Sequence, residues 1–458
     1  MGDRKTPNTE FRDNPPVNMI ARLKGVLGLP GYMRTYPGIK DYTLAWGKDR
    51  GGVYNERLDA HFRVSGDKFL IINADGTTTT IANLTGTTQA ALPFSFNTQM
   101  LVDDGKAYLY DHENGFRKIT DPDLGYPLDA TWVDGYYFFT DGEYIFHTDL
   151  ADESSITPLK YATAEFMPDS TLGVGLTSFN MVMVFGRYSI EYFSDIAQEN
   201  FAFTRIAQKS HKVGIVATHA KCEINGRWYI TGGGKKDALG VYRIVSGYPE
   251  RVSTEAIDKI LSVYPEESLS DMRMEAMYAH NHIFIFVHLP LHTLLFDETV
   301  YMASKGAHGW SLLRTVGFNH HRSINYIYDP RLHEWVCGDR DDDRLGVMRE
   351  NDFHQYGEKQ QLELYTPFVR LETGAVNGME IYTVPGILTS PESSVAVSVS
   401  RDGRGFSSEW FETYGEPSEF GKRFIIRRLG YVRNYIGLKF RSVSGSPMAF
   451  SHLRIDVD

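Results

Sequence analysis

Short runs of apolar residues, each followed by a tight polar turn, recur along most of the chain. Around residues 140–143, two aromatic runs (136–139 and 144–146) flank an Asp-Gly pair at Asp141-Gly142. Asp-Gly tolerates the positive φ angles of a type I′ turn, whose twist matches that of paired antiparallel strands. This stretch therefore predicts a β-hairpin, with an earlier turn at Asp134-Gly135.

The same pattern predicts seven hairpins, which start near residues 60, 100, 134, 180, 222, 282 and 324. Their spacing is roughly 35–60 residues, and repeats of about 40–50 residues with four short strands are typical of propeller blades. Radial repetition also leaves a long all-β chain with few exposed strand edges. Because the spacing is uneven, we expect a β-propeller of six or seven blades with insertions, over residues 41–356.

One segment departs from strand alternation. Residues 254–261 follow a candidate cap at Ser253 or Thr254 and place apolar side chains along one helical face. Residues 266–277 are expected to add a second short helix. We predict that this small helical insertion, near 254–277, contacts a partner. Its candidate interface residues are Ile257, Lys259 and Ile260.

The two ends of the chain differ in their pattern of apolar and polar residues. Residues 1–40 hold several prolines and little apolar periodicity, and are expected to form an extended N-terminal leader that ties down a neighbour. Its candidate interface residues are Pro16, Val17, Asn18 and Met19. After about residue 357 apolar and polar positions alternate, as in 436–441, so residues 357–458 predict a separate C-terminal β-sandwich. The expected fold class is all-β.

The C-terminal strands carry a dense run of basic residues in an acidic protein with a formal net charge of −11. Strand alternation places several of them on one side, which favours an outward face meeting an acidic partner over a nucleic-acid patch. The candidate interface residues are Arg423, Arg427, Arg428 and Arg433. The negative charge argues against wrapping of DNA through phosphate contacts, although it is compatible with a channel through which DNA slides.

No pattern of catalytic or metal-binding residues stands out. Residues 232–236 lack the first Gly and the final hydroxyl of a phosphate loop and are expected to form a turn. Residues 339–350 place acidic residues at calcium-loop positions, but Arg344 replaces the required Gly, so a solvated acidic loop is expected. Four histidines between 280 and 292 lack a zinc-type partner set and are expected to be stacked or solvent-facing. We expect no enzyme activity, cofactor, metal or membrane anchor.

Several passages resemble the tail hub family, the packaged DNA stabilisation proteins of short-tailed (podovirus-type) bacteriophages. They keep a consistent order along the chain, at residues 16–19, 31–39, 189–194, 256–260, 288–292, 337–339 and 428–441. The resemblance implies a structural virion protein of the tail, made in the host cytoplasm and without catalytic residues.

In more detail, the resemblance implies a homo-oligomeric ring, expected to be a hexamer, below the portal and its adaptor ring (the head-to-tail connector). This nozzle would continue the DNA channel, let DNA pass without sequence-specific binding, and stabilise the packaged genome. A tail needle or plug and tailspikes or fibres would attach to it. Two alternatives are a carbohydrate-binding or glycan-cleaving propeller, which needs aromatics or paired carboxylates on one face, and a soluble cellular scaffold.

Overall fold

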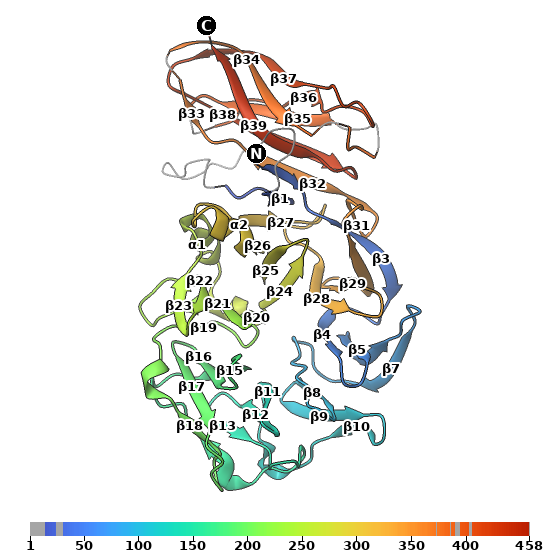
Figure 1. Cartoon of the computed structure of the whole chain (residues 1–458), viewed down its shortest axis with the longest axis vertical. Helices are drawn as coiled ribbons and strands as arrows, with labels where there is room; N and C mark the ends of the chain where they lie inside the picture. Colours follow the sequence, from blue (N-terminus) through green and yellow to red (C-terminus); the bar gives the residue numbers. More distant parts are fainter. Residues whose placement is uncertain are drawn as a thin grey trace. The chain divides into compact units, whose positions relative to one another are not determined.

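The computed structural model describes residues 14–23, 31–371, 373–384, 386–389, 394–402 and 405–457 of the 458-residue chain (Figure 1). The chain forms two compact units. The propeller unit comprises residues 42–290 and 323–347, and the sandwich unit comprises Met1–Asp41, Leu291–Arg322 and Met348–Asp458. The predicted division into 1–40, 41–356 and 357–458 stays a prediction.

The propeller unit is built from a succession of small antiparallel sheets. In chain order its described strands are β4 (Asp49–Asn55), β5 (Ala60–Ser65), β6 (Lys68–Ile72) and β7 (Thr78–Asn83); β8 (Gln99–Asp103), β9 (Lys106–Asp111) and β10 (Gly115–Lys118); β11 (Asp129–Val133), β12 (Tyr136–Thr140), β13 (Ile145–His147) and β14 (Tyr161–Ala162); β15 (Thr171–Leu176), β16 (Val182–Gly186), β17 (Ile190–Asp195) and β18 (Phe203–Arg205); β19 (Gly214–Ile215), β20 (Lys221–Ile224), β21 (Arg227–Gly233), β22 (Gly240–Val245) and β23 (Tyr248–Arg251); β24 (Arg273–Ala279) and β25 (His282–His288); and β28 (Ser323–Asp329), β29 (Glu334–Asp339) and β30 (Arg344–Arg349).

Short helical turns connect some of these strands. They are η2 (Pro122–Leu124), η3 (Pro158–Lys160), η4 (Ala207–Lys209), α1 (Glu255–Leu261) and η5 (Glu266–Leu269). Within the described residues, no helix has both the length and the apolar character that crossing a membrane requires.

The sheets of the propeller unit follow one another around a centre, as Figure 1 shows. Neighbouring sheets bury apolar layers between them: Phe62 of β5, for example, packs on Tyr110 of β9, with ring centroids 5.5 Å apart. The last sheet returns to the first, since β28 contacts β4. The described residues thus form a closed ring of seven sheets, which agrees with the predicted propeller.

Strand β12 shows why the aromatic runs lie where they do. Tyr137 and Phe139 are buried in the layer toward β8–β10, whereas Tyr136 and Phe138 are buried in the layer toward β15–β18. A strand between two neighbouring sheets has no solvent-facing side, so it is apolar on both faces.

Two-residue turns close several hairpins. Both central residues have positive φ at Asp104-Gly105, Asp134-Gly135, Asn225-Gly226, Ser246-Gly247 and His280-Asn281. The predicted type I′ turn at Asp141-Gly142 is wrong, because only Gly142 has a positive φ, of 103°. The Asp141 carboxylate instead accepts hydrogen bonds from the backbone N–H groups of Glu143 (3.0 Å) and Tyr144 (2.7 Å), which makes a longer loop. The two aromatic runs still form the predicted hairpin, in which Phe139 pairs with Phe146.

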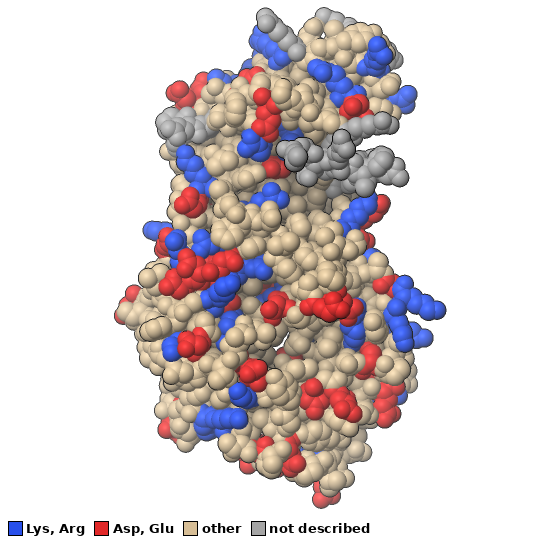
Figure 2. All heavy atoms as spheres, turned by 180° about the vertical axis from the view of Figure 1, so that it is seen from behind, with Lys and Arg blue, Asp and Glu red and all other residues tan. Residues whose placement is uncertain are grey.

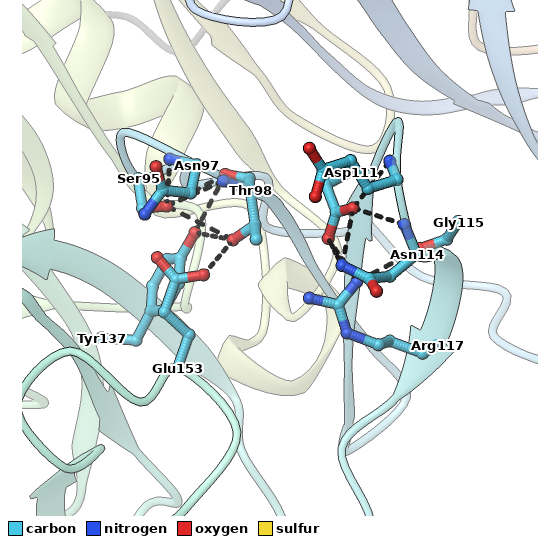
Figure 3. Close-up of polar contacts among 10 residues, drawn as sticks. Ser95, Asn97, Thr98, Asp111, Asn114, Gly115, Arg117, Tyr137 and Glu153 are labelled. Atoms are coloured by element: carbon cyan, nitrogen blue, oxygen red, sulfur yellow. Dashed lines mark hydrogen bonds and ion pairs between the residues drawn. The ribbon is translucent and has the colours of Figure 1, made fainter.

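Polar side chains fix the loops of the second and third sheets (Figure 3). The hydroxyl of Tyr137 lies 3.0 Å from Oγ1 of Thr98, which in turn donates to Glu153 at 2.7 Å. The Asp111 carboxylate accepts from the N–H of Asn114 at 2.6 Å and pairs with Arg117. These bonds hold the loop before β8 against β12 and close the β9–β10 turn.

Only the second half of the expected turn at 232–236 is present, at residues 234–237, where the N–H of Asp237 donates to the carbonyl oxygen of Gly234 at 3.1 Å. Gly232 and Gly233 end strand β21, where Gly232 pairs with both Ile215 and Gly240. A Cβ on Gly232 would overlap the carbonyl oxygen of Gly214. Glycine is used here because two backbones approach closely.

The sandwich unit contains two sheets that face each other. One has the order β1 (Met19–Arg22), β2 (Tyr32–Thr35), β39 (Ala449–Val457), β34 (Gly374–Thr383) and β37 (Phe424–Val432). The other has the order β31 (His354–Gln355), β32 (Glu358–Tyr365), β38 (Tyr435–Ser444), β35 (Ser394–Ser400) and β36 (Trp410–Thr413), with β33 (Val369–Arg370) also on β38. Also in this unit are β26 (Thr293–Asp297), α2 (Glu298–Ala303) and β27 (Trp310–Leu313), and β3 (Gly38–Leu44) begins there.

The core of the sandwich unit is a cluster of aliphatic and aromatic side chains from both sheets. Phe440 of β38 stacks on Phe450 of β39, with centroids 5.7 Å apart and an interplanar angle of 14°. The predicted C-terminal β-sandwich is therefore present, and it includes strands from the N-terminal segment.

Candidate assembly surfaces

The N-terminal segment is anchored by one buried asparagine. Asn18 has a φ of 52° and no solvent exposure. Its side-chain amide donates to the carbonyl oxygens of Arg314 and Gln361, both at 2.7 Å. Its side-chain oxygen accepts from the N–H of Arg314 at 2.9 Å. One side chain thus links the N-terminal segment to the chain after β27 and to β32.

The burial of this segment corrects part of the predicted interface. Val17, Asn18 and Met19 are buried against other parts of the sandwich unit, so they are internal packing residues in this chain and not an exposed docking surface. Pro16 is half-buried, and its carbonyl oxygen accepts from the N–H of Leu312 at 2.8 Å.

The helical insertion is only partly as predicted. Helix α1 places Ile257 inside, Ile260 half-buried and Lys259 on the surface, where its ammonium pairs with Glu255 at 2.8 Å. The predicted second helix over 266–277 is wrong: η5 is four residues long, and residues from Arg273 onward form strand β24. Strand β24 pairs along its whole length with β25, and four of its seven residues are buried. The exposed part of the insertion is therefore small.

Some of the basic side chains predicted on the C-terminal strands have no acidic partner among the described residues. Arg423 is neutralised by Glu380, which accepts from both its Nε and Nη2 at 2.6 Å. Arg427 and Arg433 are exposed, and no carboxylate pairs with either of them within the described part of the chain. The side chain of Arg428 lies outside the described residues. Two of the four predicted arginines thus present an unneutralised charge to solvent.

Large exposed apolar side chains are a feature that the sequence reasoning missed. The most exposed are Phe179 (82%), Phe420 (72%), Val263 (71%), Phe411 (69%) and Tyr248 (66%). Phe179 and Phe420 each stand in a polar turn, at 177–180 and 418–421. An aromatic residue at a turn, where no core can receive it, is the sequence signal that identifies such positions. Figure 2 shows acidic and basic side chains interspersed over one face of the molecule.

The interior of the propeller ring is unusually polar. Arg63 of β5, fully buried, donates to Asp49 at 2.8 Å and to the carbonyl oxygens of Asn325 and Val336, both at 3.1 Å. Nδ1 of His61 lies 3.1 Å from Asp329. These bonds join the first sheet of the ring to the last one, and so hold the ring closed.

Burial changes the proton affinity of these groups. Desolvation lowers the pKa of His61 to about 4, although the hydrogen bond to Asp329 opposes the shift. Desolvation raises the pKa of Asp49, which Arg63 and Asn325 oppose. Burial also raises the pKa of Glu275, but His288, 2.5 Å away, and the nearby Arg273 outweigh it, so the Glu275 pKa is lowered overall. His61 is therefore neutral and Glu275 charged at neutral pH.

The acidic residues of the candidate calcium loop and the histidines between 280 and 292 make other contacts in the described part of the chain. Among them, no three His, Cys, Asp or Glu side chains form a metal-binding group. The Asp339 carboxylate accepts from the N–H groups of Asp341 (2.9 Å) and Asp342 (3.3 Å), so it caps a turn. His282 and His288 stack on Phe284 and Phe286, as the stacked alternative predicted, although both histidines are buried.

Comparison with known proteins identifies the family. A family model described as bacteriophage P22 Gp10, beta-propeller, matches residues 1–352, and a second, described as bacteriophage P22 Gp10, beta-sandwich, matches residues 361–458. The chain belongs to the P22 Gp10 family. The tail hub protein gp10 of Salmonella phage P22 is 28% identical over 470 residues, which span 98% of this chain and 96% of that protein.

Membership of the P22 Gp10 family confirms two predictions. This chain is a tail hub protein of the short-tailed phage type, and it is a structural component of the virion and not an enzyme. The predicted combination of a β-propeller and a β-sandwich is likewise confirmed.

Solved structures with a similar chain path include virginiamycin B lyase from Staphylococcus aureus, with a TM-score of 0.44, 10% identity, and coverage of 66% of this chain and 94% of that one. The Pan2 WD40 domain of Neurospora crassa has a TM-score of 0.44 and 8% identity, and the match covers 68% of this chain and 96% of that domain.

Proposed function

We propose that this tail hub assembles into a homo-oligomeric ring, expected to be a hexamer, below the portal-adaptor ring of the virion. There it continues the DNA channel, stabilises the packaged genome, and carries the tail needle and the tailspikes or fibres. The observation that supports this proposal is the match to a tail hub protein over 98% of the chain. The net charge of −11 is compatible with a channel along which DNA slides without being held.

The free arginines of β37 and its following turn are our candidates for docking to an acidic partner. Arg427 and Arg433 offer charge that no carboxylate among the described residues of the sandwich unit neutralises. Exposed charges of this kind mainly affect the rate of association and its salt dependence. The exposed aromatics Phe411, Phe420 and Tyr431 lie in the same unit and supply apolar contact area.

The test is DNA retention by filled phage heads that lack this protein, with purified protein added back in increasing amounts. We expect retention to rise with dose, and electron microscopy of the particles to give the ring symmetry. Heads that leak at every dose, together with no co-sedimentation of the protein, would overturn the proposal.

Charge reversal at Arg427 and Arg433 tests their role in docking within the same assay. The double variant Arg427→Glu/Arg433→Glu is expected to shift the dose for half-maximal retention upward by about tenfold, since two exposed ion pairs contribute about 1–2 kcal/mol. Lys236→Glu, which makes the same type of change in an exposed loop of the propeller unit, is the matched control. Equal doses for all three proteins would remove the assignment of Arg427 and Arg433.

A further inference from the structure

Nearly every charged side chain in the interior of the propeller ring has an opposite charge beside it. The pairs are Arg50 with Asp103, Arg63 with Asp49, and Lys221 with Asp129. Glu275 is held by a hydrogen bond from His288, whose own pKa is lowered by burial, so that the imidazole is uncharged at neutral pH. The carboxylates also accept backbone N–H groups: Asp129 accepts from Val174 at 2.9 Å, and Glu275 accepts from Tyr326 at 2.6 Å. The acceptor positions of these carboxylates are therefore largely occupied.

Arg273 differs from the other interior cations. It opens strand β24, which lies between β20 of the preceding sheet and β28 of the following one, and so belongs to the inner wall of the ring. Within the described part of the chain, the Arg273 side chain makes no hydrogen bond or ion pair, and its Nε atom is buried without a partner. Leaving a charged donor in the interior without a partner is costly.

The surroundings of Arg273 favour an anion over a further carboxylate. Glu275 and Asp49 are the nearest acidic groups, but His288 and Arg63 already bind them. His219, on the segment before β20, is kept uncharged at neutral pH because burial and the charges of Arg273 and Lys221 lower its pKa well below the usual value. The negative charge of Glu275 lies near Arg273, but within the described residues no side chain accepts a hydrogen bond from the Arg273 guanidinium.

The charge around the opening limits the ligand. Figure 2 shows a small hollow in the middle of the propeller unit, with Asp and Glu side chains near its rim. An acidic rim repels a polyanion such as DNA, whereas a small ion with one or two charges can pass. A guanidinium binds such oxyanions through two parallel N–H···O bonds.

We propose that Arg273 binds a small inorganic oxyanion, such as phosphate, inside the propeller ring. The anion supplies the acceptor that the Arg273 guanidinium lacks and links β24 to the sheets on either side of it. Binding of this kind stabilises the closed ring in proportion to the logarithm of the anion concentration above Kd. The proposal does not depend on the ring stoichiometry or on the tail partners.

The test is thermal unfolding of the full chain in sodium phosphate between 0.05 and 10 mM (about two decades around a sub-millimolar Kd), with sodium chloride at matched ionic strength. We expect a saturable rise of Tm by about 3–6 °C in the wild type. In Arg273→Met the rise is lost, while the control Lys236→Met, which removes an exposed positive charge, keeps it. A rise that is equal in wild type and Arg273→Met, or that grows without saturation as expected from general salt exclusion, overturns the proposal.

A direct measurement covers the case in which Arg273→Met does not fold. Equilibrium dialysis of the wild-type chain against radiolabelled phosphate is expected to give about one bound phosphate per chain. Arg273→Lys, which keeps the charge but loses the planar fork, is expected to weaken binding by about tenfold. No phosphate retained by the wild type would also overturn the proposal, and phosphate retained equally in the presence of excess short duplex DNA would show that the site excludes DNA, as proposed.

Discussion

Replacing Asn18 is the sharpest test of how the N-terminal segment is held. In Asn18→Ala the carbonyl oxygens of Arg314 and Gln361 and the N–H of Arg314 lose their partner. Each buried group left unsatisfied costs about 1–3 kcal/mol, and some of this is recovered where the backbone relaxes. We take about 4 kcal/mol for the three bonds, to which an alanine at a φ of 52° adds about 1 kcal/mol.

Asn18→Gly separates these two contributions. Glycine accepts the positive φ, so it should lose the hydrogen bonds but not the conformational term, and should be about 1 kcal/mol more stable than Asn18→Ala. Asn180→Ala is the matched control, because Asn180 has a φ of 60° but lies exposed in a turn. It is expected to cost about 1–2 kcal/mol.

The assay is scanning calorimetry of the full chain together with amide hydrogen exchange of residues 17–22. For a unit of this size 1 kcal/mol shifts Tm by about 2–4 °C, so Asn18→Ala should lower the transition of the sandwich unit by about 10 °C or more. Exchange of the 17–22 amides should speed up in parallel. A fall of less than about 2 °C with unchanged exchange would show that the segment is not anchored by Asn18.

Three further predictions concern the propeller unit. Arg63→Met leaves Asp49 buried without its cation and should cost about 3–5 kcal/mol in urea unfolding, whereas a loss below about 1 kcal/mol would contradict the role of Arg63 in ring closure. Because the pKa of His61 falls from 6.5 to about 4 on folding, the unfolded chain binds more protons between these values, and stability is retained above pH 6.5 and lost as pH falls toward 4. His61→Gln should reduce that slope by up to about 1.4 kcal/mol per pH unit, and an unchanged slope would refute the assignment. Gly232→Ala should lower the free energy of unfolding by about 3 kcal/mol or more, because the added Cβ overlaps the carbonyl oxygen of Gly214. In the control Gly233→Ala the nearest contact of the added Cβ is 3.2 Å, so the loss should be far smaller. Equal losses in the two variants would contradict the close approach of the two backbones at Gly232.

Local chemistry made the hairpins predictable. Asp134-Gly135 and Asn225-Gly226 carry the turn signal themselves, and the aromatic run 136–139 after Asp134-Gly135 pairs with residues 130–133 across that turn. The error at Asp141 is also local: its carboxylate can cap the following N–H groups, and this competed with the turn type that the Asp-Gly pair favours.

Long-range partners made the rest unpredictable. Asn18 is surrounded by prolines and turn residues, and nothing near it in sequence indicates partners 296 and 343 residues away. Arg63 reads as an ordinary polar position in an alternating strand, yet it is fully buried because its acceptors come from the last sheet of the ring. Burial of a polar residue depends on which sheet arrives opposite it, and that is set by the closure of the ring.

In the sandwich unit, strands from the two ends of the chain pair with each other, so part of this unit can form only late in synthesis. Strand β2 pairs Met33 with Phe450 of β39, and it pairs with β1 on its other side. At about 5–20 residues per second, a ribosome needs roughly 20–80 s to travel between these two positions. During that time the propeller sheets can form one after another, but the N-terminal strands have no sheet to join. A chain that stops before β39 leaves β2 and β34 without the strand that joins them, so the first sheet of the sandwich unit can be completed only after β39 has been made.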